Sequence, residues 1–243
     1  MAGNPRNRMD TLSGCIRRWG LAALLLFGCT PPPAPRMDEA RASVHQLFTI
    51  PQSERTRAWG EASVSADGET YECGIEVRAV ADSFAADFYG PLGIRFGTIR
   101  ASTSSGRGSL RFRDDTNQFD LSQPVSIPPF GSNESLTYGE LLQVLWGRVP
   151  SEYEDLADKP ADSIISNHGA ITLLWKTDSM KFHVIVENHP VAIAGVDALF
   201  TDYGTGGARL GMSSFKDGRA RKIEIRQGDG NYFSITYSRV KRY

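Results

Sequence analysis

Residues 70–80 read TYECGIEVRAV, a run in which apolar and polar side chains take turns along the chain. The apolar members at every second position are Tyr71, Cys73, Ile75, Val77 and Ala79. Side chains of a β-strand point alternately to the two faces of its sheet, so a period of two is typical of a strand with one buried and one wet face. The run therefore predicts a half-buried strand in an antiparallel sheet.

The same period of two continues along the chain and predicts a mainly β fold. Residues 83–89 repeat it with Phe84, Ala86 and Phe88 on one face. Further strands are expected at residues 94–102, 107–113, 117–121, 170–176, 181–187 and 196–203, and a closing hairpin at residues 221–226 and 231–237. About ten strands with helical pieces predict a strongly curved, incompletely closed antiparallel β-barrel or half-barrel of the α+β class.

Two segments have the helical period instead. Residues 36–48 carry apolar side chains at near-helical spacing and end before a proline. Residues 136–148 form a broader apolar stripe, which Gly147 and Pro150 terminate. A short helical turn is expected at residues 161–166, and we expect the helices to cover one opening of the sheet.

The start of the chain has the format of a secretory signal. Arg17 and Arg18 precede the apolar run 19–27, which is too short to span the ~30 Å hydrocarbon core of a bilayer. Residues 26–29, Leu-Phe-Gly-Cys, are similar to the lipobox of bacterial lipoproteins, in which lipid is attached to the cysteine sulfur. This similarity predicts lipidation of Cys29, and an ordinary signal peptide with an incidental cysteine is the alternative.

The chain is expected to have three parts. Residues 1–28 are a lipoprotein signal peptide, residues 29–35 are the lipidated Cys29 with a proline-rich tether, and residues 36–243 are one β domain. Proline favours extended backbone without internal hydrogen bonds, so the tether is a semi-rigid spacer. The formal net charge of −1 and the lack of a long basic run indicate that nucleic acid is not the partner.

A catalytic or metal centre is not expected. The sequence contains no HExxH motif, glycine-rich phosphate loop, GxSxG motif or CxxC pair. His183, Glu187 and His189 would share one face of an extended strand and offer metal ligands, but exposed polar residues on a wet face give the same pattern. Cys73 is the only cysteine left in the β domain, so it should pack as a small buried hydrophobe. We therefore expect neither enzymatic activity nor a cofactor.

One corner of the sequence does not fit a plain turn. Gly90, Pro91, Leu92 and Gly93 stand between two alternating strands. Proline sets φ and glycine accepts positive φ, so turn chemistry explains three of these residues. It does not explain Leu92, whose side chain either folds back into the core, as the pattern alone favours, or is exposed for a function.

Several short features occur in the order of a known family. They are Cys29, the run 59–62 (Trp-Gly-Glu-Ala), the corner 87–93 (Asp-Phe-Tyr-Gly-Pro-Leu-Gly), the helix 136–148 with its ending Leu-Leu-Gln-Val-Leu-Trp-Gly-Arg, and the closing hairpin. With these features the chain resembles the LolB family of outer-membrane lipoprotein receptors and, more broadly, the LolA/LolB superfamily of periplasmic lipoprotein carriers. The resemblance extends over most of residues 36–240.

The resemblance implies a lipid-handling function. In that family an unclosed, curved sheet wraps a hydrophobic cavity that takes the acyl chains of a lipoprotein, and helices cover its mouth. A protruding leucine on an Asn-Pro-Leu-Gly-like loop promotes membrane insertion. Leu92, with Pro91 and Gly93, matches that loop, although Gly90 replaces the asparagine. The implied partners are acyl chains of lipoproteins and a periplasmic lipoprotein carrier, and the implied location is the outer membrane, facing the periplasm.

The side chains expected to line such a cavity are the inward aromatic and aliphatic ones. They are Phe84, Phe88, Phe96, Phe112, Leu141, Leu145, Trp146, Trp175 and Phe182. An ordinary core requires the same residue types, because apolar burial is non-directional and leaves no sharp motif. We expect a monomer, attached to the membrane through Cys29.

Two features depart from the family pattern and keep a second hypothesis open. Residues 151–169 look like an insertion, and residues 239–243 are more basic than a receptor needs. An anionic membrane surface could attract this basic end, although solvated charge at a terminus is the commoner explanation. The alternative function is that of a non-enzymatic envelope lipoprotein with the same fold, a solid interior and a surface that binds a protein partner.

Overall fold

The computed structural model describes most of the chain beyond the tether. The described residues are 35–48, 55–66, 68–80, 82–113, 115–126, 132–167, 169–178, 180–188, 191–200, 208–227 and 230–243. Residues Ala34–Tyr243 form one compact unit. The expected signal peptide, Cys29 and the tether up to residue 34 lie outside the described residues, so lipidation of Cys29 stays a prediction.

Thirteen strands form one large sheet. They are β1 (Thr56–Ala66), β2 (Glu69–Val80), β3 (Ser83–Tyr89), β4 (Arg95–Ser102), β5 (Arg107–Phe112), β6 (Asp115–Asp120), β9 (Ser163–Asn167), β10 (Ala170–Lys176), β11 (Met180–Asn188), β12 (Val191–Phe200), β13 (Ala208–Ser213), β14 (Lys222–Gln227) and β15 (Tyr232–Arg242). A separate hairpin pairs β7 (Pro124–Ser126) with β8 (Ser132–Thr137).

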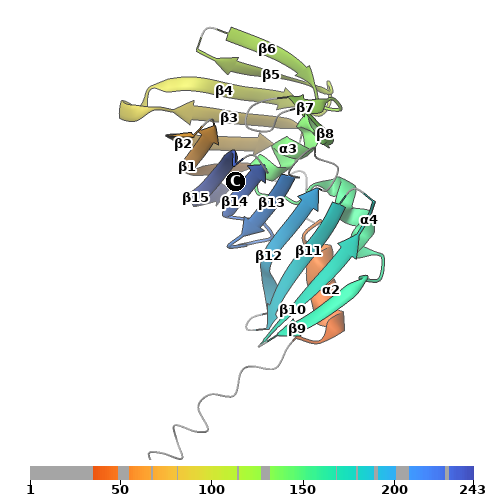
Figure 1. Cartoon of the computed structure of the whole chain (residues 1–243). Helices are drawn as coiled ribbons and strands as arrows, with labels where there is room; N and C mark the ends of the chain where they lie inside the picture. Colours follow the sequence, from red (N-terminus) through yellow and green to blue (C-terminus); the bar gives the residue numbers. More distant parts are fainter. Residues whose placement is uncertain are drawn as a thin grey trace, which may run out of the picture. The chain divides into compact units, whose positions relative to one another are not determined.

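The order of the strands explains how the sheet stays open. It runs β6-β5-β4-β3-β2-β1-β15-β14-β13-β12-β11-β10-β9, and neighbouring strands are antiparallel. The path through the sheet begins at β1 in its middle and adds neighbouring strands out to β6. It then crosses to the opposite edge at β9 and adds neighbouring strands back to β15 beside β1 (Figure 1). The edge strands β6 and β9 each have a single partner among the described strands, so the sheet is curved but not closed.

The structure confirms a mainly β fold with helices and a curved, unclosed antiparallel sheet, but two details of the expectation are wrong. The sheet has thirteen strands rather than about ten, and β13 has no predicted counterpart. Residues 161–166 are not a helical turn, because Ser163–Asn167 form the edge strand β9. The adjacent β-branched side chains of Ile164 and Ile165 favour this extended backbone.

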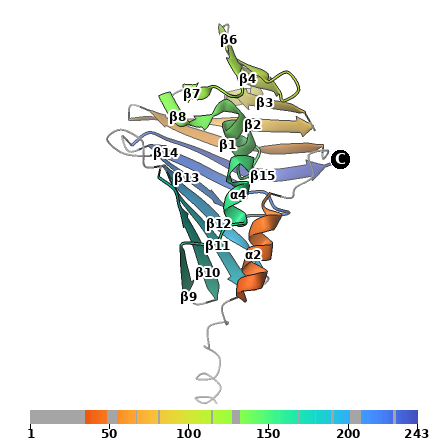
Figure 2. The same cartoon turned by 90° about the vertical axis from the view of Figure 1, so that its right-hand side faces the viewer.

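Among the described residues, three α-helices lie on one side of the curved sheet (Figure 2). They are α2 (Met37–Gln46), α3 (Tyr138–Leu145) and α4 (Glu154–Ala157), and the 3₁₀ turn η3 (Ser151–Tyr153) precedes α4. Figure 2 shows α3, α4 and α2 one after another along the same side of the sheet. The apolar stripe of α3 is buried, including Leu141, Val144 and Leu145.

Both ends of α3 are fixed by local hydrogen bonds. At the start, the Glu140 amide donates to Thr137 Oγ1 at 3.2 Å, and the Thr137 amide donates to Glu140 Oε2 at 2.7 Å. This reciprocal pair is a capping box. At the end, the Gly147 amide donates to the Val144 carbonyl at 2.8 Å, and the next amide donates to the Gln143 carbonyl at 2.9 Å. Gly147 has φ 75°, so the helix ends in a Schellman motif.

The end of α3 is also docked on the sheet. The Ala220 amide donates to the Gly147 carbonyl at 2.8 Å. The buried Tyr237 hydroxyl of β15 donates to the Leu145 carbonyl, and burial raises the pKa of this phenol. A Cβ added at Gly147 would lie 2.5 Å from the Ala220 carbonyl oxygen. Only glycine therefore allows the end of α3 to approach Ala220, in the connection between β13 and β14, this closely.

We expect Gly147→Ala to destabilise the fold by about 2–5 kcal/mol, because left-handed backbone strain adds to an overpacked contact. Gly230→Ala is the matched control, since Gly230 has φ 91° and its added Cβ would meet nothing within 4 Å. The control should lose only about 1–2 kcal/mol. Urea unfolding followed by circular dichroism measures both losses. Equal losses would contradict the docking of α3 through Gly147.

Candidate functional site

An apolar cavity of about 730 Å³ lies between strands β1–β5 and α3. Its walls come from these five strands, from Phe233 of β15, and from Leu141 and Leu145 of α3. Protein cavities that bind small molecules measure about 300–1,000 Å³. The cavity is therefore large enough for a ligand, and most of the side chains around it are hydrocarbon.

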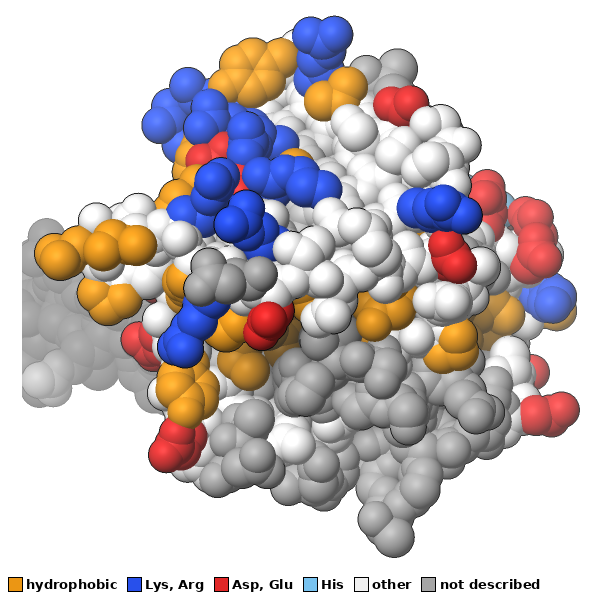
Figure 3. Space-filling view, turned by 90° about the horizontal axis from the view of Figure 1, so that it is seen from above, with side chains coloured by type: hydrophobic (Ala, Val, Ile, Leu, Met, Phe, Trp, Pro, Cys, Tyr) orange, Lys and Arg blue, Asp and Glu red, His pale blue; other side chains and the backbone are white. Residues whose placement is uncertain are grey.

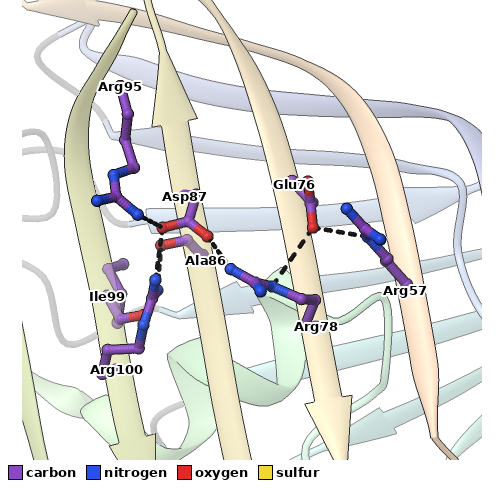
Figure 4. Close-up of polar contacts among 8 residues, drawn as sticks. All are labelled: Arg57, Glu76, Arg78, Ala86, Asp87, Arg95, Ile99 and Arg100. Carbon is purple, nitrogen blue, oxygen red and sulfur yellow. Dashed lines mark hydrogen bonds and ion pairs between the residues drawn. The ribbon is translucent and has the colours of Figure 1, made fainter.

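A β-bulge determines which side chains of β4 enter the cavity. The register of β3 against β4 shifts after the Phe88–Gly97 pair, which leaves Phe96 without a partner residue. Strict alternation from Gly97 would place Phe96 on the outer face, but the bulge turns its ring into the cavity wall. The same shift leaves Arg95 on the outer face, where it approaches Asp87 (Figure 4).

Gly97 keeps the middle of this wall open. A Cβ added there would be in ordinary contact with Phe88 at 3.5 Å and with Phe112 at 3.6 Å. The rings of Phe96 and Phe112 meet edge to face, with 5.6 Å between their centroids. Three aromatic side chains thus surround a position that has no side chain. A larger residue at Gly97 would extend into the cavity.

The structure brings five of the nine expected lining residues to this cavity: Phe88, Phe96, Phe112, Leu141 and Leu145. Phe84 and Trp146 border a separate hollow of about 310 Å³ instead. Trp175 and Phe182 lie in the packed core of the other half of the sheet, with 6.0 Å between their ring centroids. Alternation places them on an inner face, but Tyr153 of η3 packs against Phe182 and fills the space there.

Several lining residues are missing from the set expected from the sequence. They include Val64 of β1, Cys73 of β2, Ile99 of β4, Leu110 of β5 and Phe233 of β15. Cys73 belongs to the alternating run 70–80, so the signal for its inward position was present. It is partly buried, and burial raises the pKa of its thiol. The thiol therefore stays uncharged at neutral pH and fits an apolar wall.

Exposed apolar side chains surround the mouth of the cavity. Tyr71 and Phe112 line the cavity and are 60% and 49% exposed. Pro91 also lines it, while the following residues Leu92 and Ile94 are 96% and 66% exposed. We call Tyr71, Leu92, Ile94 and Phe112 the rim. Clustered apolar exposure of this kind marks contact with a partner or a membrane.

The corner between β3 and β4 holds Leu92 outward. Pro91–Gly93 form a 3₁₀ turn, in which Leu92 has φ 65° and Gly93 has φ 72°. The Gly90 amide donates to the Ile94 carbonyl at 2.9 Å and closes the corner. Left-handed backbone at a leucine costs about 1–2 kcal/mol. The expectation that Leu92 folds back into the core, which the pattern alone favours, is wrong.

On the opposite face of β2–β4, one buried carboxylate holds three arginines together (Figure 4). The fully buried Asp87 contacts Arg78, accepts from Arg100 Nη2 at 2.6 Å, and lies 3.5 Å from Arg95 Nη1. Burial by itself would raise the pKa of Asp87. Hydrogen bonds from Arg100 and Arg78, and their charges, outweigh burial and lower this pKa below its ordinary value. The network fixes Arg95 directly after the corner.

We expect Asp87→Asn to lower the free energy of unfolding by about 1–3 kcal/mol at neutral pH, because three arginines lose a charged acceptor. The folded pKa of Asp87 is depressed, so its contribution is present above the unfolded pKa of about 3.9 and is lost as pH falls through the folded pKa. The gap between wild type and variant should therefore narrow below about pH 4.

Urea unfolding at several pH values measures this gap. Asp197→Asn is the control, because Asp197 pairs with the exposed Arg209 on the surface. Such exposed pairs contribute only about 0–1 kcal/mol. A gap for Asp87→Asn that is no larger than that of the control would contradict the structural role of the buried carboxylate.

The described part of the chain contains no metal centre and no membrane-spanning helix. Among the described residues, no group of three or more His, Cys, Asp or Glu side chains is placed to hold a metal ion. Of the candidate ligands, His183 and Glu187 lie on β11, and His189 lies outside the described residues. None of the helices described is long and apolar enough to cross a membrane.

No protein-family model matches the chain, and no curated protein matches it. A domain from Vibrio parahaemolyticus, provisionally described as an outer membrane lipoprotein-sorting protein, is similar in structure, with a TM-score of 0.55 and 10% sequence identity. The match covers 84% of this chain and 91% of that chain. The chain has a LolA/LolB-like fold.

Two more structures are similar. A DUF1329 family protein from Desulfovibrio piger has a TM-score of 0.54 and 10% identity over 86% of this chain and 93% of that chain. A LolA superfamily protein from Nitrosomonas europaea has a TM-score of 0.47 and 11% identity over 86% and 94%. The two structures with TM-scores above 0.5 support the LolA/LolB-like fold that the resemblance implies. Similarity at about 10% identity shows the fold alone.

Proposed function

We propose that the chain binds the acyl chains of lipoproteins in the apolar cavity and helps to insert lipoproteins into the outer membrane. The observation that carries this proposal is an unfilled apolar cavity whose mouth has the exposed Leu92 beside it. Moving an acyl chain between protein and bilayer makes and breaks no covalent bond. The proposed function is therefore non-enzymatic.

Acyl chains fit the chemistry of the cavity walls. Each methylene group that leaves water contributes roughly 0.8 kcal/mol, and this energy requires apolar surface but no particular direction. The rings around Gly97 and the leucines of α3 supply such surface. Among the described lining residues, only Glu72 and Arg113 have charged side chains. A ligand with an extended hydrocarbon part is favoured over a polar metabolite.

The rim fits delivery to a membrane. Leu92 and Ile94 are mostly exposed and sit on the corner whose Pro91 lines the cavity. Apolar side chains gain free energy when they enter hydrocarbon, so the rim favours contact with a bilayer at the place where cargo would leave. In this proposal α3 covers the cavity on the side away from the strands.

The rest of the proposal concerns the surroundings of the domain. Lipid on Cys29 and the proline-rich tether would attach a monomeric domain to the outer membrane, on its periplasmic side. A periplasmic carrier would deliver the cargo. The alternative, an envelope protein that binds a protein partner, requires a solid interior, and the cavity of about 730 Å³ argues against it.

Gly97→Leu should weaken acyl binding by filling the cavity. The leucine side chain would occupy space between Phe88 and Phe112. We expect at least about a 10-fold loss of affinity, because displacing two methylene groups loses roughly 1.6 kcal/mol. Fluorescence anisotropy of a labelled long-chain fatty acid, added to the full-length chain with Cys29→Ser, measures this affinity.

The matched control for this filling is Gly211→Leu. Gly211 lies on β13 outside the cavity, and its added Cβ would meet only the Glu224 carbonyl oxygen, at 3.9 Å. The control should bind the fatty acid as the parent protein does. Failure of the parent protein to bind the fatty acid would reject acyl binding. Equal affinities of the two leucine variants would place binding elsewhere.

Leu92→Glu should separate binding from delivery. The substituted side chain remains in solvent, so folding and fatty-acid affinity should not change. Transfer of a lipidated lipoprotein from the chain into phospholipid vesicles should fall by at least about 10-fold, because a carboxylate does not enter hydrocarbon. A vesicle flotation assay measures the transferred fraction.

Ile165→Glu is the control for the rim. Ile165 is an exposed apolar residue, about as exposed as Phe112 of the rim, but it lies on the edge strand β9. Its substitution should leave transfer unchanged. If Leu92→Glu transfers lipoprotein as fast as the parent protein, Leu92 has no part in delivery.

A further inference from the structure

A basic pocket lies directly behind the rim. Arg95, Arg100, Arg111 and Arg113 line a hollow of about 260 Å³ at the end of the sheet that carries the corner. Among the described residues that line the hollow, which also include Thr98, none is a carboxylate. Figure 3 shows Lys and Arg side chains gathered on this side of the molecule, next to apolar side chains. The concentration of positive charge requires an explanation beyond folding.

The arginines are held in two different ways. Asp87 holds Arg95 and Arg100, so these two guanidinium groups are fixed before any ligand arrives. Arg111 donates to the Arg113 carbonyl at 3.3 Å, and neither of these two arginines forms a salt bridge with a carboxylate among the described residues. The pocket therefore has two positioned guanidinium groups, of Arg95 and Arg100, and two, of Arg111 and Arg113, that have no carboxylate partner among the described residues.

The pocket and the acyl cavity share a wall. Phe96, Gly97 and Arg113 line both. The Arg113 amide donates to the Phe96 carbonyl at 2.8 Å, and the Arg113 guanidinium lies 5.7 Å from the centre of the Phe112 ring. Arg113 thus extends past a rim residue. A surface that meets the rim also meets these arginines.

Guanidinium groups match phosphate better than other anions, because their fork of donors binds two oxygens at once. A bilayer presents phosphate groups directly above the hydrocarbon that the rim would enter. We propose that this basic pocket binds the phosphate headgroups of anionic membrane lipids and thereby orients the rim on the bilayer. The inference rests on the proposed function only in placing the rim at a membrane.

A second hollow extends the basic surface. It measures about 580 Å³, and its lining includes Arg78, Arg100 and Arg107 together with Ser109 and Gln118. Arg100 lines both hollows, so they adjoin. Hydroxyl and amide groups beside arginines add donors for phosphate oxygens. The outer face can therefore contact more than one headgroup.

The double variant Arg111→Gln with Arg113→Gln tests the pocket, since both side chains are exposed and stand outside the Asp87 network. The full-length chain with Cys29→Ser is mixed, without cargo, with vesicles of phosphatidylglycerol in phosphatidylcholine. Binding by cosedimentation should weaken by roughly 30-fold, the effect of two arginines near an anionic surface. Raising the salt from about 0.1 M to about 1 M should weaken binding by the parent protein too, because screening shortens the range of the charges.

The control is Lys176→Gln with Lys181→Gln, which removes the same charge from exposed positions on β10 and β11. It should bind vesicles like the parent protein. Arg111→Lys with Arg113→Lys keeps the charge but loses the fork, so it should bind between the parent and glutamine variants. Thermal unfolding should show the same midpoint for all of these chains.

Three results would overturn the inference. In the first, the Arg111→Gln, Arg113→Gln variant binds vesicles as well as the Lys176→Gln, Lys181→Gln control. In the second, the parent protein binds vesicles of phosphatidylcholine alone as well as vesicles that contain phosphatidylglycerol. In the third, the parent protein binds inorganic phosphate but no vesicles. The last result would assign the pocket to a free anion. The fatty-acid assay of Gly97→Leu is independent of these vesicle measurements. If the protein binds the fatty acid but does not prefer vesicles with phosphatidylglycerol, only the headgroup site is rejected. If it prefers these vesicles but does not bind the fatty acid, only the acyl cavity is rejected.

Discussion

The site depends on how closely one helix approaches the curved sheet. α3 is held at its end by the Gly147 carbonyl, which accepts from the Ala220 amide, and by the Tyr237 hydroxyl on the Leu145 carbonyl. These contacts fix where Leu141 and Leu145 stand relative to strands β1–β5. α3 is short and the bend of the sheet is wide. The apolar side chains of α3 and of strands β1–β5 therefore face a space that they do not fill. The unclosed sheet is what makes this mismatch possible.

The bulge at Phe96 links the two faces of the sheet. An extra residue reverses the alternation locally, so an aromatic ring enters the cavity wall while the preceding Arg95 reaches the buried Asp87 on the other face. The corner with Leu92 precedes this bulge directly. The strained backbone of the corner is therefore next to Phe96, which lines the cavity, and to Arg95, which contacts Asp87 on the outer face. Exposure of the leucine is a consequence of this attachment and not of a loose loop.

The periodicity of the sequence predicts much of the fold. It does not predict which inward-facing side chains line an open cavity and which are covered by other residues. The alternation in residues 70–80 predicts β2, and the apolar stripe in residues 136–148 predicts α3. Five of the nine expected lining residues line the cavity. Trp175 and Phe182 have the same inward pattern and are packed, because η3 covers them. Alternation predicts which face of the sheet a side chain lies on, but not whether another element packs against that face. The position of Leu92 also needed coordinates, since turn chemistry permits either direction.

An apolar cavity requires little of the sequence around it. Hydrocarbon can be surrounded by many combinations of aromatic and aliphatic side chains, so the walls can change as long as volume and polarity are kept. This explains why a LolA/LolB-like fold is shared at only 10% identity. A particular residue is required only where the local geometry is unusual. Such places are Gly97 in the cavity wall, Gly147 at the end of α3, and the corner at Leu92. Substitution at these places changes the space or its mouth, whereas most exchanges between apolar residues elsewhere preserve both.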